Sequence, residues 1–232
     1  MEFYNILLVT EGDEEYCFFK TIAEMPNVIS DSFKVEVCDA GGFGGVGPLF
    51  QDQFGADLYD CVLCVYDVDF KADDAASPFG VIQNDLLEVL GNQEAVDAVS
   101  FCTNPNFLQI YLLGMDVADN VALHSTSKVD NTGLVHKYWP SIAKPKKDLH
   151  GHDATKNYDA KKWQLEIINE SFCKNPDQYK AIIRNAVALG SEYRDGGNPG
   201  SNVPLLLSAL INGDVAFFEN IRKVVNEEET LC

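Results

Sequence analysis

Two apolar runs that end in carboxylates are the feature that most limits how this chain can fold. Residues 4–10 lead directly into Glu11, and residues 61–66 lead into Asp67 and Asp69. Short apolar runs bounded by turn or polar residues predict buried β-strands. Because ligands of parallel sheets lie outside the carboxyl ends of the strands, two such strands can place their carboxylates side by side there.

Further patterns along the chain alternate between strands and helices. Strand-like runs recur near 33–38 and 98–102, and segments with helical spacing separate them. Helices are predicted over 13–25, 46–57, 80–96, 105–114, 159–173, 176–189, 202–211 and 214–227. Alternating strands and helices of this length predict an α/β fold with a mainly parallel sheet, covered by helices on both faces.

The chain changes character near residue 120. The segment 118–158 is polar, is predicted to be rich in loops and contains all four histidines, and residues 190–200 form a second predicted loop. We therefore expect a core over residues 1–120, with a loop-rich and helical C-terminal region over 121–232 packed on it. A length of 232 residues, of which 46% are hydrophobic, is sufficient for one such α/β domain with an extension.

The composition indicates a folded protein outside the membrane. No apolar stretch approaches the roughly 20 residues that span a bilayer, and residues 1–4 lack the basic region of a secretion signal, so we expect a cytoplasmic location. The 36 acidic residues against 17 basic ones give a net charge of −19, which opposes unaided binding to a polyanion. A protein partner, a homo-oligomer or bound metal ions would offset this charge where nucleic acid docks.

The carboxylates at the strand ends predict a site for a divalent metal. Glu11 and Glu15 are four residues apart at the start of a helix and so share a face. Asp67 and Asp69 are two residues apart on a strand and so point to the same side. Four converging carboxylates need a cation between them to remain ionised. Oxygen ligands suit Mg²⁺ or Mn²⁺, and such ions support phosphoryl transfer and phosphodiester hydrolysis.

These motifs resemble the Toprim domain, which occurs in topoisomerases, bacterial primases, recombination-repair proteins and the overcoming-lysogenization-defect nucleases. The resemblance rests on Leu8–Gly12 together with Asp67–Asp69. More narrowly, the chain is similar to RloB-like proteins, which are small Toprim proteins associated with bacterial restriction and abortive-infection loci. The segments that carry this similarity are Glu11–Phe19, Val65–Asp69, Asn104–Phe107 and Ile110–Leu113.

The resemblance implies a metal-dependent nuclease of bacterial antiviral defence, with nucleic acid as its substrate. It implies that Glu11 is a general acid/base or a metal ligand and that Glu15 is an accessory ligand. It also implies that Asp67 and Asp69 hold Mg²⁺. Related nucleases stabilise the transition state with a basic residue from beyond the core, and Lys156 is the candidate by its position and surroundings.

One helix of the RloB-like pattern departs from the family motif at two places. Leu108 and Gln109 follow the phenylalanine where the family has an acidic residue, and Gly114 with Met115 replaces a terminal histidine. The part that this helix plays in the site is therefore open.

Two other functions fit parts of the sequence. Gly42, Gly44 and Gly47 form a G-x-G-x-x-G pattern after the strand at 33–38, and Asp67 follows twenty residues later, as in a dinucleotide-binding unit. The glycines begin a few residues after the strand, and this interpretation leaves the other carboxylates unexplained, so a flexible crossover loop suits them better. A Toprim-like protein of strong negative charge could instead be a non-catalytic regulatory or sensor subunit that binds a basic partner.

Two short motifs also invite a metal interpretation. Cys61 and Cys64 form a C-x-x-C, but residues three apart on a strand face opposite sides and the chain has no second C-x-x-C. We interpret these thiols as core residues in a reducing compartment. His150 and His152 are close enough in sequence to chelate a metal, although nothing else in their loop supports a site.

Overall fold

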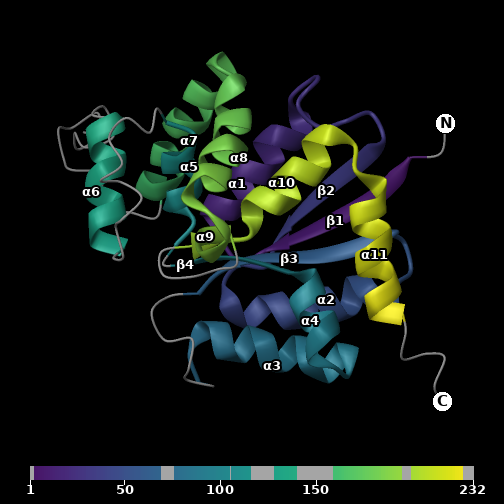
Figure 1. The fold of residues 1–232 in the computed structure, drawn as a ribbon. Helices are drawn as coiled ribbons and strands as arrows, with labels where there is room; N and C mark the ends of the chain where they lie inside the picture. The colour runs from purple at the N-terminus through teal and green to yellow at the C-terminus, as the bar shows by residue number, and fades with distance from the viewer. Residues whose placement is uncertain are drawn as a thin grey trace.

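Figure 1 shows the computed structural model of the chain, in which helices cover both faces of a sheet. The structure describes residues 3–68, 76–104, 106–115, 128–139, 159–194 and 200–226. Five strands form the sheet: β1 (Tyr4–Thr10), β2 (Phe33–Asp39), β3 (Cys61–Asp67), β4 (Ser100–Asn104) and β5 (Gly200–Ser201). Their order is β2-β1-β3-β4-β5. Strands β1 to β4 are parallel and β5 is antiparallel to β4, so the predicted mainly parallel α/β fold is confirmed.

The helices divide between the two faces of the sheet. Their bounds are α1 (Asp13–Glu24), α2 (Phe43–Gly55), α3 (Pro78–Leu90), α4 (Gln93–Val99), α5 (Leu108–Leu113), α6 (Lys128–Tyr138), α7 (Asp159–Lys174), α8 (Asp177–Leu189), α9 (Ser191–Arg194), α10 (Val203–Asn212) and α11 (Val215–Asn226). Helices α1, α8 and α10 lie on one side, and α2, α3 and α4 lie on the other (Figure 1). The chain moves across the sheet one way from β1 to β2 and the other way from β2 to β4. Right-handed crossovers therefore place the connecting helices on opposite faces.

The four predicted strands are confirmed, but one predicted helix is divided. The segment 80–96 forms two helices, α3 and α4, instead of one. Gly91 ends α3 with a φ of 80°, a left-handed conformation that glycine adopts most easily. Asn92 then begins α4 by accepting a 2.7 Å hydrogen bond from the backbone N–H of Ala95. The Gly-Asn pair is therefore both a stop signal and a start signal.

The prediction of loops over 118–158 and 190–200 is partly wrong. Helix α6 lies inside the first segment, and α9 and the start of β5 lie inside the second. Sequence patterns miss α6 because it shows no continuous apolar stripe; Val135 is the one of its described side chains that is buried. Strand β5 has only two residues and depends on its partner strand, with a 2.9 Å contact between the hydroxyl oxygens of Thr103 and Ser201.

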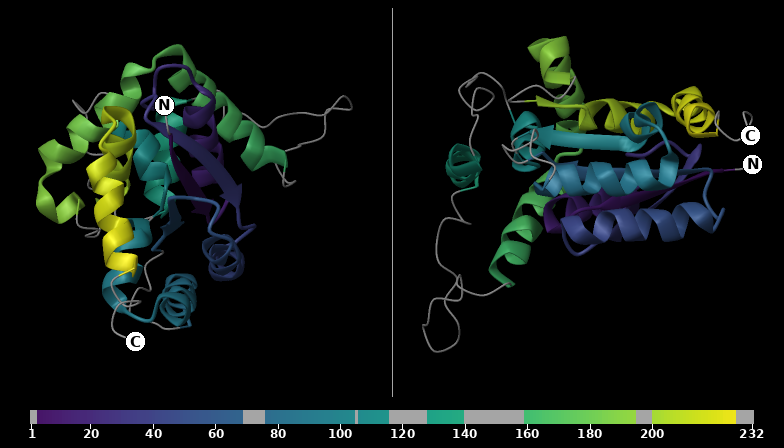
Figure 2. Two further views of the ribbon diagram at one scale, coloured as in Figure 1. Left: turned by 90° about the vertical axis from the view of Figure 1, so that its right-hand side faces the viewer. Right: turned by 90° about the horizontal axis from the view of Figure 1, so that it is seen from below.

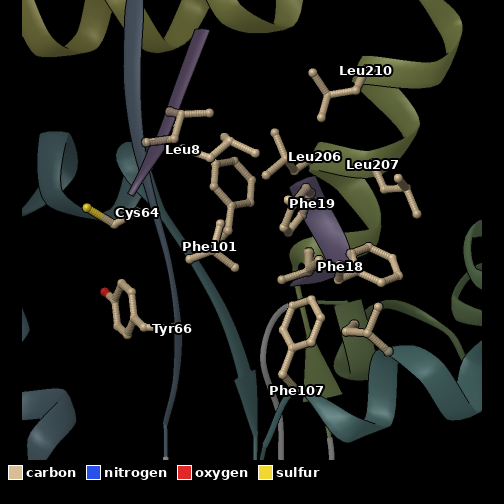
Figure 3. Packing of buried hydrophobic residues seen from close by; sticks show 14 of the residues in the cluster. Leu8, Phe18, Phe19, Cys64, Tyr66, Phe101, Phe107, Leu206, Leu207 and Leu210 are labelled. Carbon is tan, nitrogen blue, oxygen red and sulfur yellow. The ribbon is translucent and has the colours of Figure 1, made fainter. Parts of the chain in front are cut away.

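An aromatic cluster joins the C-terminal helices to α1. The ring of Phe18 packs edge-on against four rings from outside α1, at centroid distances of 5.3 to 6.3 Å: Phe107, Tyr111, Phe172 and Tyr179. Figure 3 shows Phe101 and Phe107 on the same side of the sheet as Phe18, whereas Cys64 and Tyr66 of β3 point to the other side. Helices α7 and α8 therefore pack against the helix that follows β1.

The amino end of the sheet is covered by α11. The ring of Phe218 lies 6.0 Å from that of Tyr4 and 5.0 Å from that of Phe33. The left view of Figure 2 shows α11 beside the sheet, near the end at which β1 begins. The carboxyl ends of the parallel strands lie at the opposite end of the sheet. Among the described residues, no helix combines the length and the apolar character needed to cross a membrane.

Candidate metal centre

Three of the carboxylates predicted from the sequence, Glu11, Glu15 and Asp67, lie where the strand order reverses. The chain leaves β1 toward α1 on one face of the sheet and leaves β3 for α3 on the other face (Figure 1). The ends of β1 and β3 are neighbours, with Thr10 paired to Val65. In open α/β sheets, such a switch point leaves a crevice in which ligands bind.

Three buried carboxylates meet at this point. Glu14 and Glu15 come from the first turn of α1, and Asp67 is the last residue of β3. Each offers one oxygen atom, and these oxygens lie within 4.8 Å of one another. The three residues are 8%, 3% and 7% exposed, respectively. The structure thus brings together two of the predicted ligands, Glu15 and Asp67, and adds Glu14.

Helix α1 buries its two glutamates because they lie on its core face. The buried residues of this helix are Glu14, Glu15, Phe18, Phe19 and Ile22, which have the spacing of one apolar stripe. The Tyr111 hydroxyl also donates a 3.2 Å hydrogen bond to the carbonyl oxygen of Glu14, and this bond ties α5 to the first turn of α1. Sequence reasoning missed Glu14, although its position four residues before Phe18 is a signal that could have found it.

The close approach of the three carboxylates has an energetic consequence. Two unit charges 4.8 Å apart repel each other by roughly 3 kcal/mol at an effective dielectric constant of about 20. The dipole of α1 favours acidic residues in its first turn, but it does not require that they be buried. An anionic donor set made only of oxygens fits Mg²⁺ or Mn²⁺. The chemistry of Glu14, Glu15 and Asp67 therefore fits a divalent cation.

Glu11 lies beside this group and contacts it through the backbone. It is partly exposed, and the group of three found among the described residues does not include it. Its Oε2 accepts a 3.0 Å hydrogen bond from the backbone N–H of Asp67. The interpretation of Glu11 as a metal ligand or a general acid/base stays a prediction.

Two predicted site residues, Asp69 and Lys156, lie outside the part of the chain that the structure describes. The roles of Asp69 as a ligand and of Lys156 as a catalytic cation therefore stay predictions. His150 and His152, whose spacing alone suggested a metal, also lie outside the described residues.

The glycine-rich segment after β2 supports the loop that carries Glu11. Gly42 has a φ of 123°, and its N–H donates a 2.7 Å hydrogen bond to the carbonyl oxygen of Glu11. Gly44 and Gly47 lie inside α2. A Cβ atom at Gly44 would meet nothing within 4 Å, whereas one at Gly47 would lie 2.3 Å from the Cβ of Asp85 in α3. Glycine at position 42 thus allows the turn, and glycine at position 47 allows α2 and α3 to approach closely.

The strand cysteines have the properties of core thiols. Burial raises the pKa of Cys61 to about 12 and that of Cys64 well above its ordinary value. Burial likewise raises the pKa of Cys102 to about 12, and the negative charges of Asp67 and Glu11 add to the effect. Because zinc binds thiolates, thiols that stay protonated at neutral pH fit the core interpretation.

Comparisons with known proteins give little beyond this geometry. No protein-family model and no curated protein sequence matches the chain. Among solved structures, the chain is similar to the C-terminal region of the Burkholderia pseudomallei OLD protein, with 12% sequence identity over 98% of this chain and 99% of that chain. The TM-score is 0.37, and a likeness this weak carries no conclusion about the fold or the activity of this chain.

Proposed function

We propose that this chain is a Mg²⁺- or Mn²⁺-dependent nuclease that hydrolyses phosphodiester bonds with a Toprim-like carboxylate site. The observation that carries the proposal is the meeting of Glu14, Glu15 and Asp67 at the β1–β3 switch point. Buried charges of one sign lower stability unless they are compensated. A divalent cation would neutralise them and so explain why the three carboxylates are buried together.

The residues of the site have distinct proposed parts. Glu14, Glu15 and Asp67 hold the cation, which when bound supplies an activated water molecule and stabilises charge on the phosphate oxygens. These carboxylates belong to the end of a buried strand and the first turn of a packed helix, so they are oriented before substrate binds. Asp69 is proposed as a further ligand, and Lys156 is proposed as the cation that stabilises the transition state.

Nucleic acid requires a basic surface, and this acidic chain concentrates its cations in one segment. Twelve of the 17 lysine and arginine residues, but only eight of the 36 acidic residues, lie between 128 and 194. Lys180 and Arg184 are exposed on α8, and their spacing of four places them on one helix face. Helices α7 and α8 contact α1 and α5, respectively. We therefore assign the phosphate backbone to this segment, with a protein partner or a second copy of the chain as further positive charge.

The similarity to RloB-like proteins supports a finer proposal, a role in bacterial antiviral defence through abortive infection. It rests on the segments Glu11–Phe19 and Val65–Asp69. The net charge of −19 favours one alternative, a non-catalytic regulatory or sensor subunit that binds a basic partner.

Cleavage of plasmid DNA, single-stranded DNA and tRNA tests the proposal directly. Wild type, Asp67→Asn and Asp13→Asn are compared with Mg²⁺, Mn²⁺ or EDTA. Asp13 is the matched control because it lies in the same first turn of α1 but outside the carboxylate group. We expect metal-dependent cleavage by wild type and Asp13→Asn and none by Asp67→Asn. Cleavage that persists in Asp67→Asn or in EDTA contradicts the proposed site, and metal binding without cleavage favours the regulatory alternative.

A further inference from the structure

Strand β2 forms one edge of the sheet, and among the described residues it pairs with β1 alone. The Ser32 carbonyl, just before β2, accepts the N–H of Tyr4 at 3.0 Å. The Ala40 N–H, just after β2, donates a 2.9 Å hydrogen bond to the Thr10 carbonyl. Because the backbone groups of successive strand residues point to opposite sides, the even-numbered residues of β2 face β1. The odd-numbered residues therefore turn their N–H and C=O groups outward.

These outward groups leave a free row of backbone donors and acceptors. Those of Val35 and Val37 have no backbone partner in the part of the chain that the structure describes. The Phe33 N–H is already used, since it donates to the Ser30 carbonyl at 3.0 Å. Unpaired groups along an edge strand are a template on which a further strand can pair.

The charges on β2 restrict which strand can pair there. Lys34 and Glu36 form a 2.7 Å ion pair on one face of the strand, and their side chains are 62% and 44% exposed. The Tyr59 hydroxyl also donates a 2.8 Å hydrogen bond to Glu36 Oε2. Charged residues usually protect an edge from pairing, but an exposed ion pair contributes little stability, so its members can take further partners at small cost. The edge therefore suits a strand with the opposite charge at each of these two positions.

Strand β2 itself meets this requirement when two copies run antiparallel about Val35. In that register, Lys34 of each copy lies opposite Glu36 of the other, and the outward groups of the two Val35 residues bond to each other. The Lys34–Glu36 pairs are then the non-hydrogen-bonded ones, whose Cα atoms are about 4.5 Å apart and whose side chains lie closest. On the other face, Val35 meets Val35 and Val37 meets Phe33. Pairing centred on Glu36 would instead place two glutamates opposite each other.

We propose that the β2 edge is a homodimer interface, in which two copies of the chain pair antiparallel about Val35 and join their sheets into one. The carboxyl ends of β1 and β3 in the two copies then point in opposite directions. Each copy therefore keeps its own candidate metal centre and its own segment 128–194. The proposal goes beyond the proposed function and holds whether or not the chain is a nuclease.

Charge reversals at the two exposed residues test the proposal by sedimentation equilibrium of the full chain, without metal or nucleic acid. Lys34→Glu and Glu36→Lys each turn both attractive pairs into repulsive ones, so the dissociation constant of the dimer should rise by about tenfold or more. An equimolar mixture of the two variants restores opposite charges in both pairs and should form a heterodimer. Lys223→Glu, at an exposed site on α11, changes the net charge as Lys34→Glu does and should dimerise like wild type.

Three results of sedimentation would overturn the proposal. A wild type that remains monomeric leaves the edge to a strand of another protein. Single variants that dimerise like wild type place the interface on another surface. A mixture that stays monomeric shows that the opposed charges do not control pairing.

Hydrogen exchange locates the interface independently of the charges. The outward amides of Val35 and Val37 donate only across the proposed dimer, so their exchange should slow as the concentration of wild type rises. In Lys34→Glu, the same amides should exchange rapidly at every concentration used for wild type. A wild-type dimer in which both amides exchange as fast as in Lys34→Glu contradicts pairing through β2.

Discussion

At the scale of single residues, the buried carboxylates that are proposed to bind a metal should lower the stability of the metal-free protein. Glu15 is 3% exposed and lies with Glu14 and Asp67 in a group of like charges. Without a cation, each member raises the free energy of the folded state through repulsion and lost solvation. A site of this kind is expected to lower the stability of the metal-free protein and to be strongly stabilised by its ligand.

Substitution of Glu15→Gln should therefore have opposite effects with and without metal. In EDTA, we expect the free energy of unfolding to rise by about 1 kcal/mol, because one of three repelling charges is removed. In Mg²⁺, the stabilisation that wild type gains from binding should be largely lost. Urea unfolding in both conditions measures the two effects. Glu24→Gln, an exposed site at the other end of α1, should change neither, and a Glu15→Gln variant that is less stable in EDTA contradicts the argument.

Some residues of the candidate site could be predicted from the sequence and others could not. Asp67 and Glu15 were predictable because strand ends and helix spacing place them at one edge of the sheet. Glu14 was missed because an acidic residue beside two others in a first turn is usually explained by the helix dipole. Its burial depends on tertiary contacts of the first turn, where the Tyr111 hydroxyl of α5 donates to the Glu14 carbonyl oxygen, and pairwise spacing within α1 does not reveal such contacts. The contact between Glu11 and the Asp67 backbone depends on where the ladder ends, which no local pattern fixes.

At the scale of secondary structure elements, the close approach of α2 and α3 leads to a testable prediction about stability. Gly47→Ala would place a Cβ atom 2.3 Å from the Cβ of Asp85, and neither backbone can yield easily. We expect a loss of roughly 1 to 3 kcal/mol in the free energy of unfolding, typical of overpacking.

Gly44→Ala in the same helix is the matched control for Gly47→Ala. Its Cβ would meet nothing within 4 Å, so we expect unchanged stability or a gain of about 0.5 kcal/mol from reduced chain entropy. Thermal unfolding of both variants makes the comparison. Equal losses at the two positions would argue against steric packing at Gly47, and a specific loss of nucleotide binding at both would favour the dinucleotide interpretation.

The elements were predicted from sequence to the extent that their signals are local. Strand β3 was found because all seven of its residues are buried, which gives a continuous apolar run. Helix α6 and strand β5 were missed because their signals are not local. Helix α6 lacks an apolar stripe, and β5 exists through its pairing with β4. The division of 80–96 was readable from Gly91 and Asn92, but apolar spacing on both sides of this pair obscured it.

At the scale of the whole molecule, the uneven distribution of charge should control where a polyanion could bind to this acidic chain. The residues outside 128–194 carry five of the 17 basic residues and twenty-eight of the 36 acidic ones. These residues should repel nucleic acid, and the segment 128–194 should attract it. A nucleic acid would then bind with its phosphate backbone toward the cations of this segment.

Paired charge reversals test this orientation. Lys180→Glu/Arg184→Glu changes two exposed cations of α8, and Lys34→Glu/Lys223→Glu changes two exposed cations of β2 and α11. Both double variants alter the net charge equally. Because each phosphate contact contributes about one unit to the slope of log affinity against log salt concentration, we expect the α8 variant to lower that slope by about two. Fluorescence anisotropy with labelled DNA or RNA between low and physiological salt provides the measurement.

The β2/α11 variant should keep the slope of wild type, since only the general repulsion changes. Equal effects of the two variants would mean that net charge alone controls binding and that the segment 128–194 has no special role.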